Sequence, residues 1–292
     1  MSPAARGLAF AALAITIFAV QDGLSKALAA EHPPLLIVMI RYWAFALFVV
    51  LMAARRPGGL RAAARSARPV LQILRSTLLA AEVVVAITAF ATVGLVATHS
   101  IFASAPLVVA ALSVPLLGEQ VGWRRWTAIL VGLFGVLLIL KPGAEVFDPR
   151  ILIAVAAMIA MALYGVLTRL ASRSDPSQVS FFYTGVAGAA ALTLVGPFYW
   201  QPLAPEHWPL MGALCVTGIA GHYFLIRAFE ALPAVVVQPF SYLQLVLASM
   251  IGIWFFGESP DALTILGAAI IVGAGLFTAW REARRGAGRV AA

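Results

Sequence analysis

A few ionisable residues lie inside long apolar stretches of this 292-residue chain. Glu82 lies deepest in such a stretch, where it could accept a substrate ammonium, relay a proton, or pair structurally with Arg75 on the same helical face. Asp22 precedes Lys26 by four residues, so on a helix these two charges could neutralise each other. Charged groups within a membrane usually serve a path or a partner. Glu82 and Asp22 are therefore the candidates for coupling, and Glu82 is also a candidate for binding cargo.

Other polar residues of the apolar stretches fall at matching depths, which predicts a ring of donors and acceptors around one centre. Together with Glu82, the predicted substrate-binding residues are Gln21, His99, Ser100, Tyr164, His222, Tyr223, Gln238, Ser241 and Tyr242. Gln238, Ser241 and Tyr242 recur at three- and four-residue intervals and so share a helical face. For the serines, close helix packing by small side chains is the alternative.

Two prolines interrupt apolar stretches that contain these residues. Pro106 and Pro239 each lack a backbone N–H, which leaves the carbonyls of Phe102 and Val235 without their usual donor. A bent helix suits a cavity wall or a hinge, because a freed carbonyl needs a protein or water partner. Both prolines are therefore predicted hinge positions.

The composition indicates which solvent surrounds these stretches. Hydrophobic residues make up 62% of the chain and charged residues 11%, whereas soluble domains carry roughly a quarter charged residues. The chain is therefore predicted to be an all-α integral membrane protein. The net charge of +8 comes from arginines that flank apolar runs, so no nucleic-acid partner is expected. A single cysteine, Cys215, excludes an intramolecular disulfide.

A bilayer core of about 30 Å requires roughly 20 apolar helical residues. Ten segments qualify as spans, at residues 7–29, 34–54, 70–93, 96–117, 124–141, 150–171, 178–198, 208–230, 234–256 and 262–281. Each connecting segment is too short for a soluble domain, so the function must lie within the bundle.

The distribution of Lys and Arg predicts the orientation of the spans. With the N-terminus in the cytoplasm, the inner basic residues are Arg6, Arg55, Arg56, Arg61, Arg65, Arg68, Arg75, Arg124, Arg125, Arg169, Arg173, Arg227, Arg281, Arg284, Arg285 and Arg289. The outer ones are only Lys26, Arg41, Lys141 and Arg150. The positive-inside rule thus predicts a multi-pass protein of the bacterial inner membrane with both termini cytoplasmic. Signal cleavage near residues 27–29 is the alternative, but Gln21, Asp22 and Lys26 interrupt the apolar run.

The ten spans fall into two related halves. A shift of 139 residues superposes Gly118-Glu119 on Gly257-Glu258, and a shift of 143 superposes Pro33 on Pro176. Each half holds five spans, so the second enters the membrane from the opposite side. The predicted organisation is two inverted five-helix repeats, at residues 1–143 and 144–292, with a shared cavity near the midplane and alternating access.

The five-plus-five arrangement, Arg41 in "IRYWAFAL", and Gly-Glu closing spans four and nine resemble the drug/metabolite transporter superfamily. More narrowly the pattern resembles its EamA-type ten-helix exporters, and within these the YddG-type exporters of aromatic amino acids. This resemblance covers essentially the whole chain. It implies a cavity lined by spans one, three, four, six, eight and nine, and export of amino acids or other metabolites.

Three classes of function are weighed. A secondary transporter exporting aromatic or neutral amino acids and related metabolites is favoured, with a drug or other-metabolite exporter as the alternative within transporters. A membrane-embedded enzyme acting on lipid or peptide is disfavoured, because Gly-x-Ser-x-Gly and His-Glu-x-x-His are both absent from the sequence. A channel would place polar groups along the whole pore. Without Gly-x-x-x-x-Gly-Lys, transport is not expected to use ATP directly.

The expected partners are a small-molecule substrate and the lipid bilayer. His99 and His222 have no third or fourth metal ligand at helical spacing, so no metal is predicted. No cofactor is predicted either, and a monomer is the simplest expectation.

Overall fold

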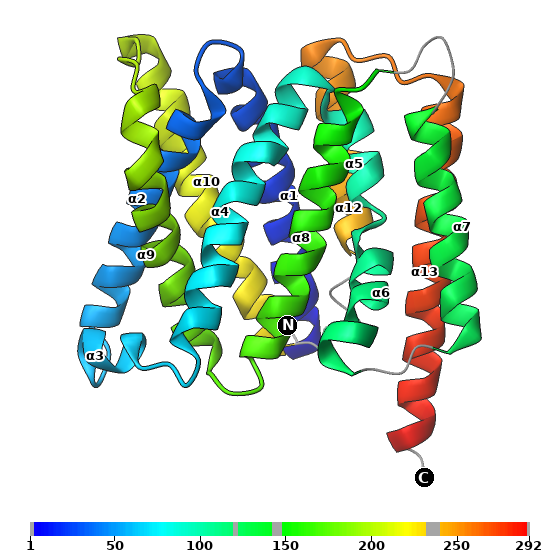
Figure 1. The fold of residues 1–292 in the computed structure, drawn as a ribbon, viewed down its shortest axis with the longest axis horizontal. Helices are drawn as coiled ribbons and strands as arrows, with labels where there is room; N and C mark the ends of the chain where they lie inside the picture. The colour runs from blue at the N-terminus through cyan, green and yellow to red at the C-terminus, as the bar shows by residue number, and fades with distance from the viewer. Residues whose placement is uncertain (1–2, 119–121, 142–147, 232–239, 291–292) are drawn as a thin grey trace.

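The computed structural model describes residues 3–118, 122–141, 148–231 and 240–290, and its regular elements there are all helices (Figure 1). The α-helices are α1 Pro3–Ala29, α2 Pro34–Ala54, α3 Gly59–Ala64, α4 Pro69–Thr92, α5 Leu95–Phe102, α6 Ala105–Leu117, α7 Trp123–Leu140, α8 Ile151–Ala171, α9 Ser177–Val195, α10 Trp208–Ala231, α12 Phe240–Phe256 and α13 Ala262–Val290. Two short 3-10 helices, η1 Gly196–Tyr199 and η2 Pro205–His207, precede α10. The all-α prediction is confirmed.

Length and composition make most of these helices able to cross a bilayer. Seven helical stretches are long and apolar enough, with α5 and α6 together forming one of them. Shorter apolar helices at Trp126–Leu140, Ser241–Phe256 and Ala262–Phe277 correspond to predicted spans five, nine and ten. The chain is therefore a multi-pass membrane protein.

The fourth span is broken into two helices. α5 ends at Phe102, α6 begins at Ala105, and Pro106 lies in the first turn of α6, where its missing N–H costs little. The break occurs where Pro106 predicts it, although its role as a hinge stays a prediction. Pro239 lies outside the described residues.

The helices of the two halves run in opposite directions. In Figure 1, α1 runs upward and α8 downward, and α4 and α10 are likewise opposed. α1 packs on α10 and α12, while α8 packs on α4 and α6, so equivalent helices have equivalent neighbours. The start of α1 and the end of α13 lie at the same face of the bundle. This arrangement is that of an inverted repeat.

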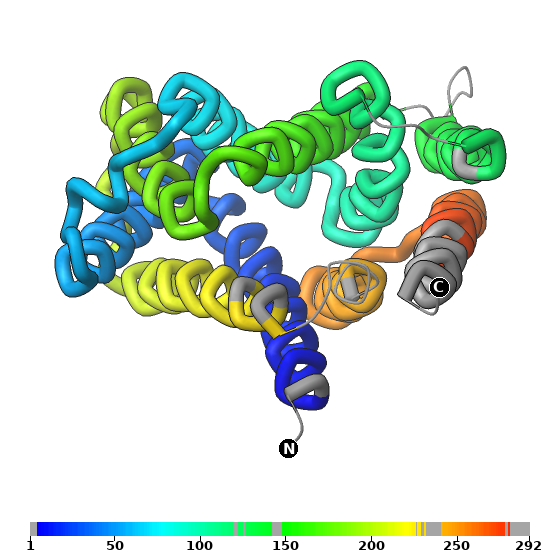
Figure 2. The backbone as a smooth tube through the Cα atoms, turned by 90° about the horizontal axis from the view of Figure 1, so that it is seen from below, coloured from blue at the N-terminus to red at the C-terminus, as the bar shows by residue number. Residues whose placement is uncertain are grey.

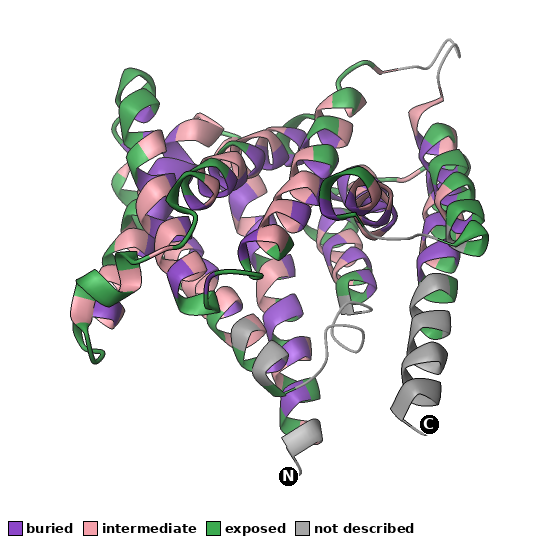
Figure 3. Ribbon diagram, turned by 60° about the horizontal axis from the view of Figure 1, so that its bottom comes forward, coloured by how far each residue is buried: buried purple, intermediate pink, exposed green. Residues whose placement is uncertain are grey.

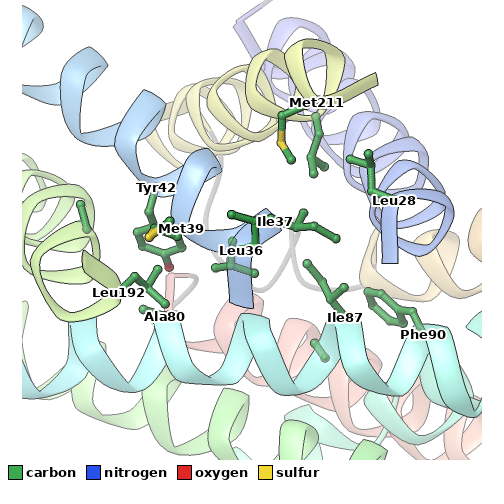
Figure 4. Close-up of a cluster of buried hydrophobic side chains, with 14 of the residues drawn as sticks. Leu28, Leu36, Ile37, Met39, Tyr42, Ala80, Ile87, Phe90, Leu192 and Met211 are labelled. Carbon is green, nitrogen blue, oxygen red and sulfur yellow. The ribbon is translucent and has the colours of Figure 1, made fainter. Parts of the chain in front are cut away.

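Packing inside the bundle is tight and its outer surface is apolar. Figure 4 shows a core in which Leu36 and Ile37 of α2 meet Ile87 and Phe90 of α4. Buried positions face the interior in Figure 3, while apolar residues such as Leu194, 77% exposed, cover the outside. Exposed apolar residues over a whole surface require a lipid surrounding.

α7 and α13 form a pair at one edge of the bundle (Figure 2). Gly135 of α7 faces Gly267 of α13, and a Cβ on either would lie 2.8 or 2.6 Å from the carbonyl oxygen of the other. Small residues at such a crossing let two membrane helices approach closely, where van der Waals packing holds them together.

A buried polar cluster ties α4 to the second half. The guanidinium of Arg75, 1% exposed, donates to the side chains of Gln72, Tyr164, Thr168 and Thr184 and to the carbonyl oxygen of Ser180. Arg75 is therefore a helix-to-helix tie rather than a loop charge. Of the three alternatives for Glu82, the structural pairing with Arg75 is not what the structure shows.

Asp175, in the turn between α8 and α9, continues this cluster. Its carboxylate accepts hydrogen bonds from Gln72 (2.8 Å), from the N–H of Ala67 (2.7 Å) and from the hydroxyl of Ser66. Partial burial raises the pKa of Asp175, but these bonds outweigh it and hold that pKa below its usual value.

Candidate functional site: a central cavity

A cavity of about 270 Å³ lies between the two halves. Its wall is formed by residues from α1, α2, α4, α5, α8, α9, α10 and α12, together with Ala103 between α5 and α6. All six spans expected to line it contribute, and α2 and α9 are added. The lining residues used below are Phe18, Gln21, Asp22, Arg41, Phe45, Glu82, Phe90, His99, Gly218, His222, Ser241 and Gln244.

Three helices meet at Asp22. Its Oδ2 accepts a hydrogen bond from the amide of Gln244 on α12 at 2.9 Å. The Nε2 of His99 on α5 lies 3.1 Å from the same oxygen. The expected neutralisation of Asp22 by Lys26 is therefore wrong. Asp22 and Lys26 lie four residues apart on α1, but each interacts with residues distant in the sequence.

Lys26 instead pairs with Glu258, which follows α12. The carboxylate of Glu258 also accepts the N–H groups of Leu95, at 2.7 Å, and Val96, at 2.8 Å. These N–H groups belong to the first turn of α5 and have no intrahelical acceptor. Glu258 thus caps α5 and joins it to α1. This link lies one helical turn along α1 from Asp22, which lines the cavity. We name Lys26, Glu258 and the first turn of α5 the capping cluster.

The charges of the cavity do not balance. Asp22 and Glu82 bring two carboxylates, and Arg41 brings one guanidinium. Glu82 is 5% exposed and Arg41 is 9% exposed, so both charges are largely withdrawn from solvent. Counted by formal charge, with both carboxyl groups ionised and histidine neutral, the described lining residues carry one more negative than positive charge. A cavity of that kind favours cargo that brings a positive charge.

Aromatic rings cover two parts of the wall. Phe90 stacks on His99 with ring centroids 5.4 Å apart, and Phe45 stacks on His222 at 5.6 Å. Phe18 meets His222 edge-on at 5.2 Å. Such faces can receive a planar ring by offset stacking or edge contact.

Two polar atoms of the wall make no hydrogen bond among the described residues, the Oε1 of Gln21 and the Nε2 of His99, although the latter lies close to Asp22. The Oε1 of Gln21 is buried and accepts no hydrogen bond there, although Gln21 lines the cavity. Gly218 on α10 makes room for it, because a Cβ at Gly218 would lie 3.3 Å from this oxygen and 3.0 Å from the Nε of Arg41. A buried acceptor left unpaired is costly, so Gln21 is available to a donor on the cargo.

The structure brings most of the predicted site residues together. Those that line the cavity are Gln21, Asp22, Glu82, His99, His222 and Ser241. Gln238 lies outside the described residues, so its predicted role stays a prediction.

Four predicted binding residues lie away from the cavity wall. Ser100 is buried, and its hydroxyl donates a hydrogen bond to the carbonyl of Val96. The hydroxyl of Tyr164 accepts a hydrogen bond from the guanidinium of Arg75. Tyr223 is 48% exposed and lines a separate groove lower in the bundle. Tyr242 is buried in an apolar cluster that includes residues of α13. Each lies one helical turn or less from a lining residue. The predicted helices therefore do line the cavity, but these four residues lie on a different face of them.

Sequence reasoning missed several lining residues. Gln244 follows Ser241 by one helical turn, a signal that was present but was passed over for the face holding Tyr242. Arg41, which the sequence analysis uses only for orientation and for the family resemblance, also lines the cavity. Nothing in the sequence distinguishes Phe45 and Phe90 from ordinary core aromatics.

The histidines do not assemble a metal site. His32 and His207 lie with their ring nitrogens 2.8 Å apart, between the end of α1 and the start of α10. No group of three or more potential ligands forms among the residues that the structure describes.

An all-helical membrane bundle of two opposed halves, enclosing a small cavity with a few polar groups in an apolar wall, together with the family and relatives below, identifies a secondary transporter of small metabolites rather than an enzyme. The chain belongs to the EamA-like transporter family, whose sequence pattern matches residues 5–141 and 149–280. A crystal structure with 21% sequence identity has a TM-score of 0.63 over 97% of this chain and 98% of the other, and shows the same fold.

Three relatives carry names that indicate cargo. An S-adenosylmethionine uptake transporter of Rickettsia prowazekii is 29% identical, covering 94% of this chain and 93% of its own. The pseudopaline exporter CntI of Pseudomonas aeruginosa is 29% identical, covering 91% and 93%. A riboflavin transporter of Vibrio cholerae is 33% identical over 58% of each chain. The narrower resemblance to YddG-type exporters stays a prediction.

Proposed function

We propose that this protein carries a metabolite that combines a positive charge, a carboxylate and a planar ring, and that S-adenosylmethionine is the first cargo to test. The observation that carries the proposal is the charge of the cavity wall, where Asp22 and Glu82 oppose the single guanidinium of Arg41 between aromatic faces. S-adenosylmethionine bears a sulfonium, an ammonium, a carboxylate and an adenine ring, and so matches each of these features.

The positions of the groups support a specific arrangement. Arg41 would take the cargo carboxylate, since guanidinium and carboxylate form paired hydrogen bonds. Asp22 and Glu82 would face the ammonium and the sulfonium. The adenine would lie against the Phe90–His99 or the Phe45–His222 stack. The full-length relative that takes up S-adenosylmethionine supports this cargo further.

Export of aromatic or neutral amino acids is the competing proposal. An amino acid would satisfy Arg41 and one carboxylate, but it would leave the second carboxylate without a counter-charge. Buried charges without partners are costly, which favours a cargo with two positively charged groups. The two proposals therefore differ in whether a second positive charge on the cargo improves binding.

Counterflow in proteoliposomes tests the cargo. Vesicles loaded with unlabelled S-adenosylmethionine should accumulate the methyl-labelled compound transiently, and empty vesicles should not. S-adenosylhomocysteine has the same ring and amino-acid group but lacks the sulfonium charge, so it should compete about ten-fold less well, which is about 1.4 kcal/mol. Exchange of phenylalanine or tryptophan without exchange of S-adenosylmethionine would support amino-acid transport instead.

Two variants connect the cargo to the cavity. Asp22→Asn and Glu82→Gln should each raise the half-saturating concentration of S-adenosylmethionine about ten-fold, because a charged hydrogen bond contributes about 1.5–3 kcal/mol. Asp261→Asn is the matched control, since Asp261 pairs with Lys141 outside the cavity. Equal effects in all three variants would contradict the proposed site.

The direction of transport and the sidedness are also proposed. We infer that the face holding both termini is cytoplasmic, because the arginines cluster there, and that residues 1–143 and 144–292 are the repeat units. A carrier of this kind moves cargo down its gradient unless an ion is coupled to it, so one protein can serve uptake or export. Labelling of cysteines introduced at Arg61 and Asp261, from one side of intact cells, would determine the orientation.

A further inference from the structure

A second hollow, of about 200 Å³, lies between α2, α9 and α10. It is at the end of the bundle where α2 and α10 end and α9 begins, the lower end in Figure 1. We name it the lower groove. Its lining consists of Phe48, Met52 and Arg56 beside α2, Ser177, Gln178 and Phe181 of α9, and Tyr223 and Arg227 of α10. None of these residues belongs to the cavity wall, so the groove is not explained by the proposed transport site.

The lower groove is apolar at one end and cationic at the other. Phe48, Met52 and Phe181 lie within the helices, whereas Arg56 lies just beyond the end of α2 at Ala54. Arg227 lies in the last turns of α10. No acidic residue is present among the described lining residues. The polarity changes along the groove as it does across one leaflet of a bilayer, from hydrocarbon to headgroup.

The polar end is well suited to a phosphate group. α9 begins at Ser177, so its first N–H groups point out of the helix beside the hydroxyl of Ser177 and the amide of Gln178. The two arginines supply charge at the same end, and the Arg227 guanidinium lies over the ring of Phe10 at 6.0 Å. Guanidinium groups bind phosphate oxygens in paired hydrogen bonds.

The groove faces the lipid rather than the cavity. Tyr223 is 48% exposed, and Val216, two turns earlier on the same face of α10, is 65% exposed. On the inner side, Phe45 packs on Phe181 with ring centroids 5.0 Å apart and stacks on His222. These rings separate the groove from the cavity.

We propose that the lower groove binds one anionic phospholipid, with its phosphate between Arg56 and Arg227 and an acyl chain against Phe48, Met52 and Phe181. Basic pockets between membrane helices at the headgroup level take such lipids. The bound lipid would connect α2 to α10 at the end where they carry the arginines.

Native mass spectrometry of the purified protein tests this lipid. The protein is exchanged into detergent with equal amounts of phosphatidylglycerol and phosphatidylcholine. Wild type should retain one phosphatidylglycerol in preference to phosphatidylcholine by about ten-fold. Arg56→Gln combined with Arg227→Gln should bring the two lipids close to equal retention. Arg61→Gln combined with Arg65→Gln removes the same charge from the exposed α3 region and should keep the preference.

A second variant keeps the proposal testable if loss of the arginines impairs folding. Met52→Trp leaves every charge in place but fills the apolar part of the groove, and it should also abolish retention of phosphatidylglycerol. Equal retention of both lipids by wild type, or equal loss in the α3 control, would overturn the proposal. Displacement by soluble glycerol phosphate would indicate a free-phosphate site instead. Displacement by S-adenosylmethionine would indicate a transport vestibule.

Discussion

Glu258→Gln should destabilise the protein much more than Asp261→Asn, a change of a carboxylate in the loop that follows it. The native carboxylate accepts the N–H groups of Leu95 and Val96 on separate oxygens and pairs with Lys26. The glutamine side chain has only one oxygen, so one of the two N–H groups at the start of α5 loses its acceptor. Its NH₂ group would then lie against an N–H group or the Lys26 ammonium, which are also donors. Glu258 and Lys26 are each only 15% exposed, so solvent replaces little of what is lost.

The size of the effect follows from these contacts. A buried N–H left unsatisfied costs about 1–3 kcal/mol, and breaking a partly buried ion pair adds to it. We therefore expect Glu258→Gln to lower the free energy of unfolding by about 3 kcal/mol. Lys26→Met leaves both N–H bonds of Glu258 in place, so its cost should be about 1 kcal/mol. The double variant should reveal a coupling of about 1–2 kcal/mol between the two residues.

Unfolding in mixed micelles of increasing SDS fraction, followed by helical circular dichroism, measures these differences. Asp261→Asn is the control, because Asp261 lies in the loop that follows Glu258 and pairs with Lys141 while 51% exposed. An exposed pair contributes about 0–1 kcal/mol. The reasoning would be refuted if Glu258→Gln and Asp261→Asn had equal effects, or if the coupling between Glu258 and Lys26 were zero.

Three further predictions concern buried charge. Arg75→Met should lower stability in the same assay by about 3 kcal/mol, because it leaves buried acceptors on three helices without their donor; an unchanged unfolding curve would exclude the helix-to-helix tie. If Glu82 carries a coupled proton, Glu82→Gln should abolish accumulation driven by a pH gradient, while counterflow at saturating cargo continues; if that accumulation persists, Glu82 contributes only to binding. The lowered pKa of Asp175 contributes stability that is present above pH ~4 and is lost as the pH falls through that lowered value. Asp175→Asn should therefore reduce the loss of unfolding free energy at low pH. Identical curves of stability against pH below pH ~4 for wild type and variant would contradict this.

The sequence was sufficient for the fold because lipid limits the options for a polar backbone. A stretch of about 20 apolar residues can cross a bilayer only as a helix whose backbone bonds are internal. The expected span 34–54 is helix α2, Pro34–Ala54, and the expected span 150–171 is α8, Ile151–Ala171. Residue matches such as Pro33 with Pro176 then indicated two halves without any contact being known.

The site was predicted less completely, because spacing along a helix does not give rotation about its axis. The face chosen on span nine contains Tyr242, whereas the cavity receives Ser241 and Gln244. In a soluble helix the polar face marks solvent, but here lipid and protein interior are both apolar. Asp22 and Lys26 illustrate the second difficulty. Their partners, His99 and Glu258, are distant in sequence, so helical spacing suggested a pair that the packing does not form.

The packing of α1 connects the capping cluster to the cavity. α1 lies between α10 and α12 of the second half (Figure 2), and meets α5 of its own half mainly through side chains. Two of these side-chain connections are the approach of Asp22 to His99 and the link of Lys26 to α5 through Glu258. Asp22 and Lys26 lie four residues apart, so both connections start from the same face of α1. A single movement of α1 away from α5 would therefore break both of them. A cationic cargo that binds Asp22 replaces the interaction with His99 that Asp22 loses in this movement. We therefore expect cargo with a second positive charge to lower the barrier to this movement, and S-adenosylhomocysteine, which lacks that charge, to exchange more slowly even at saturating concentration.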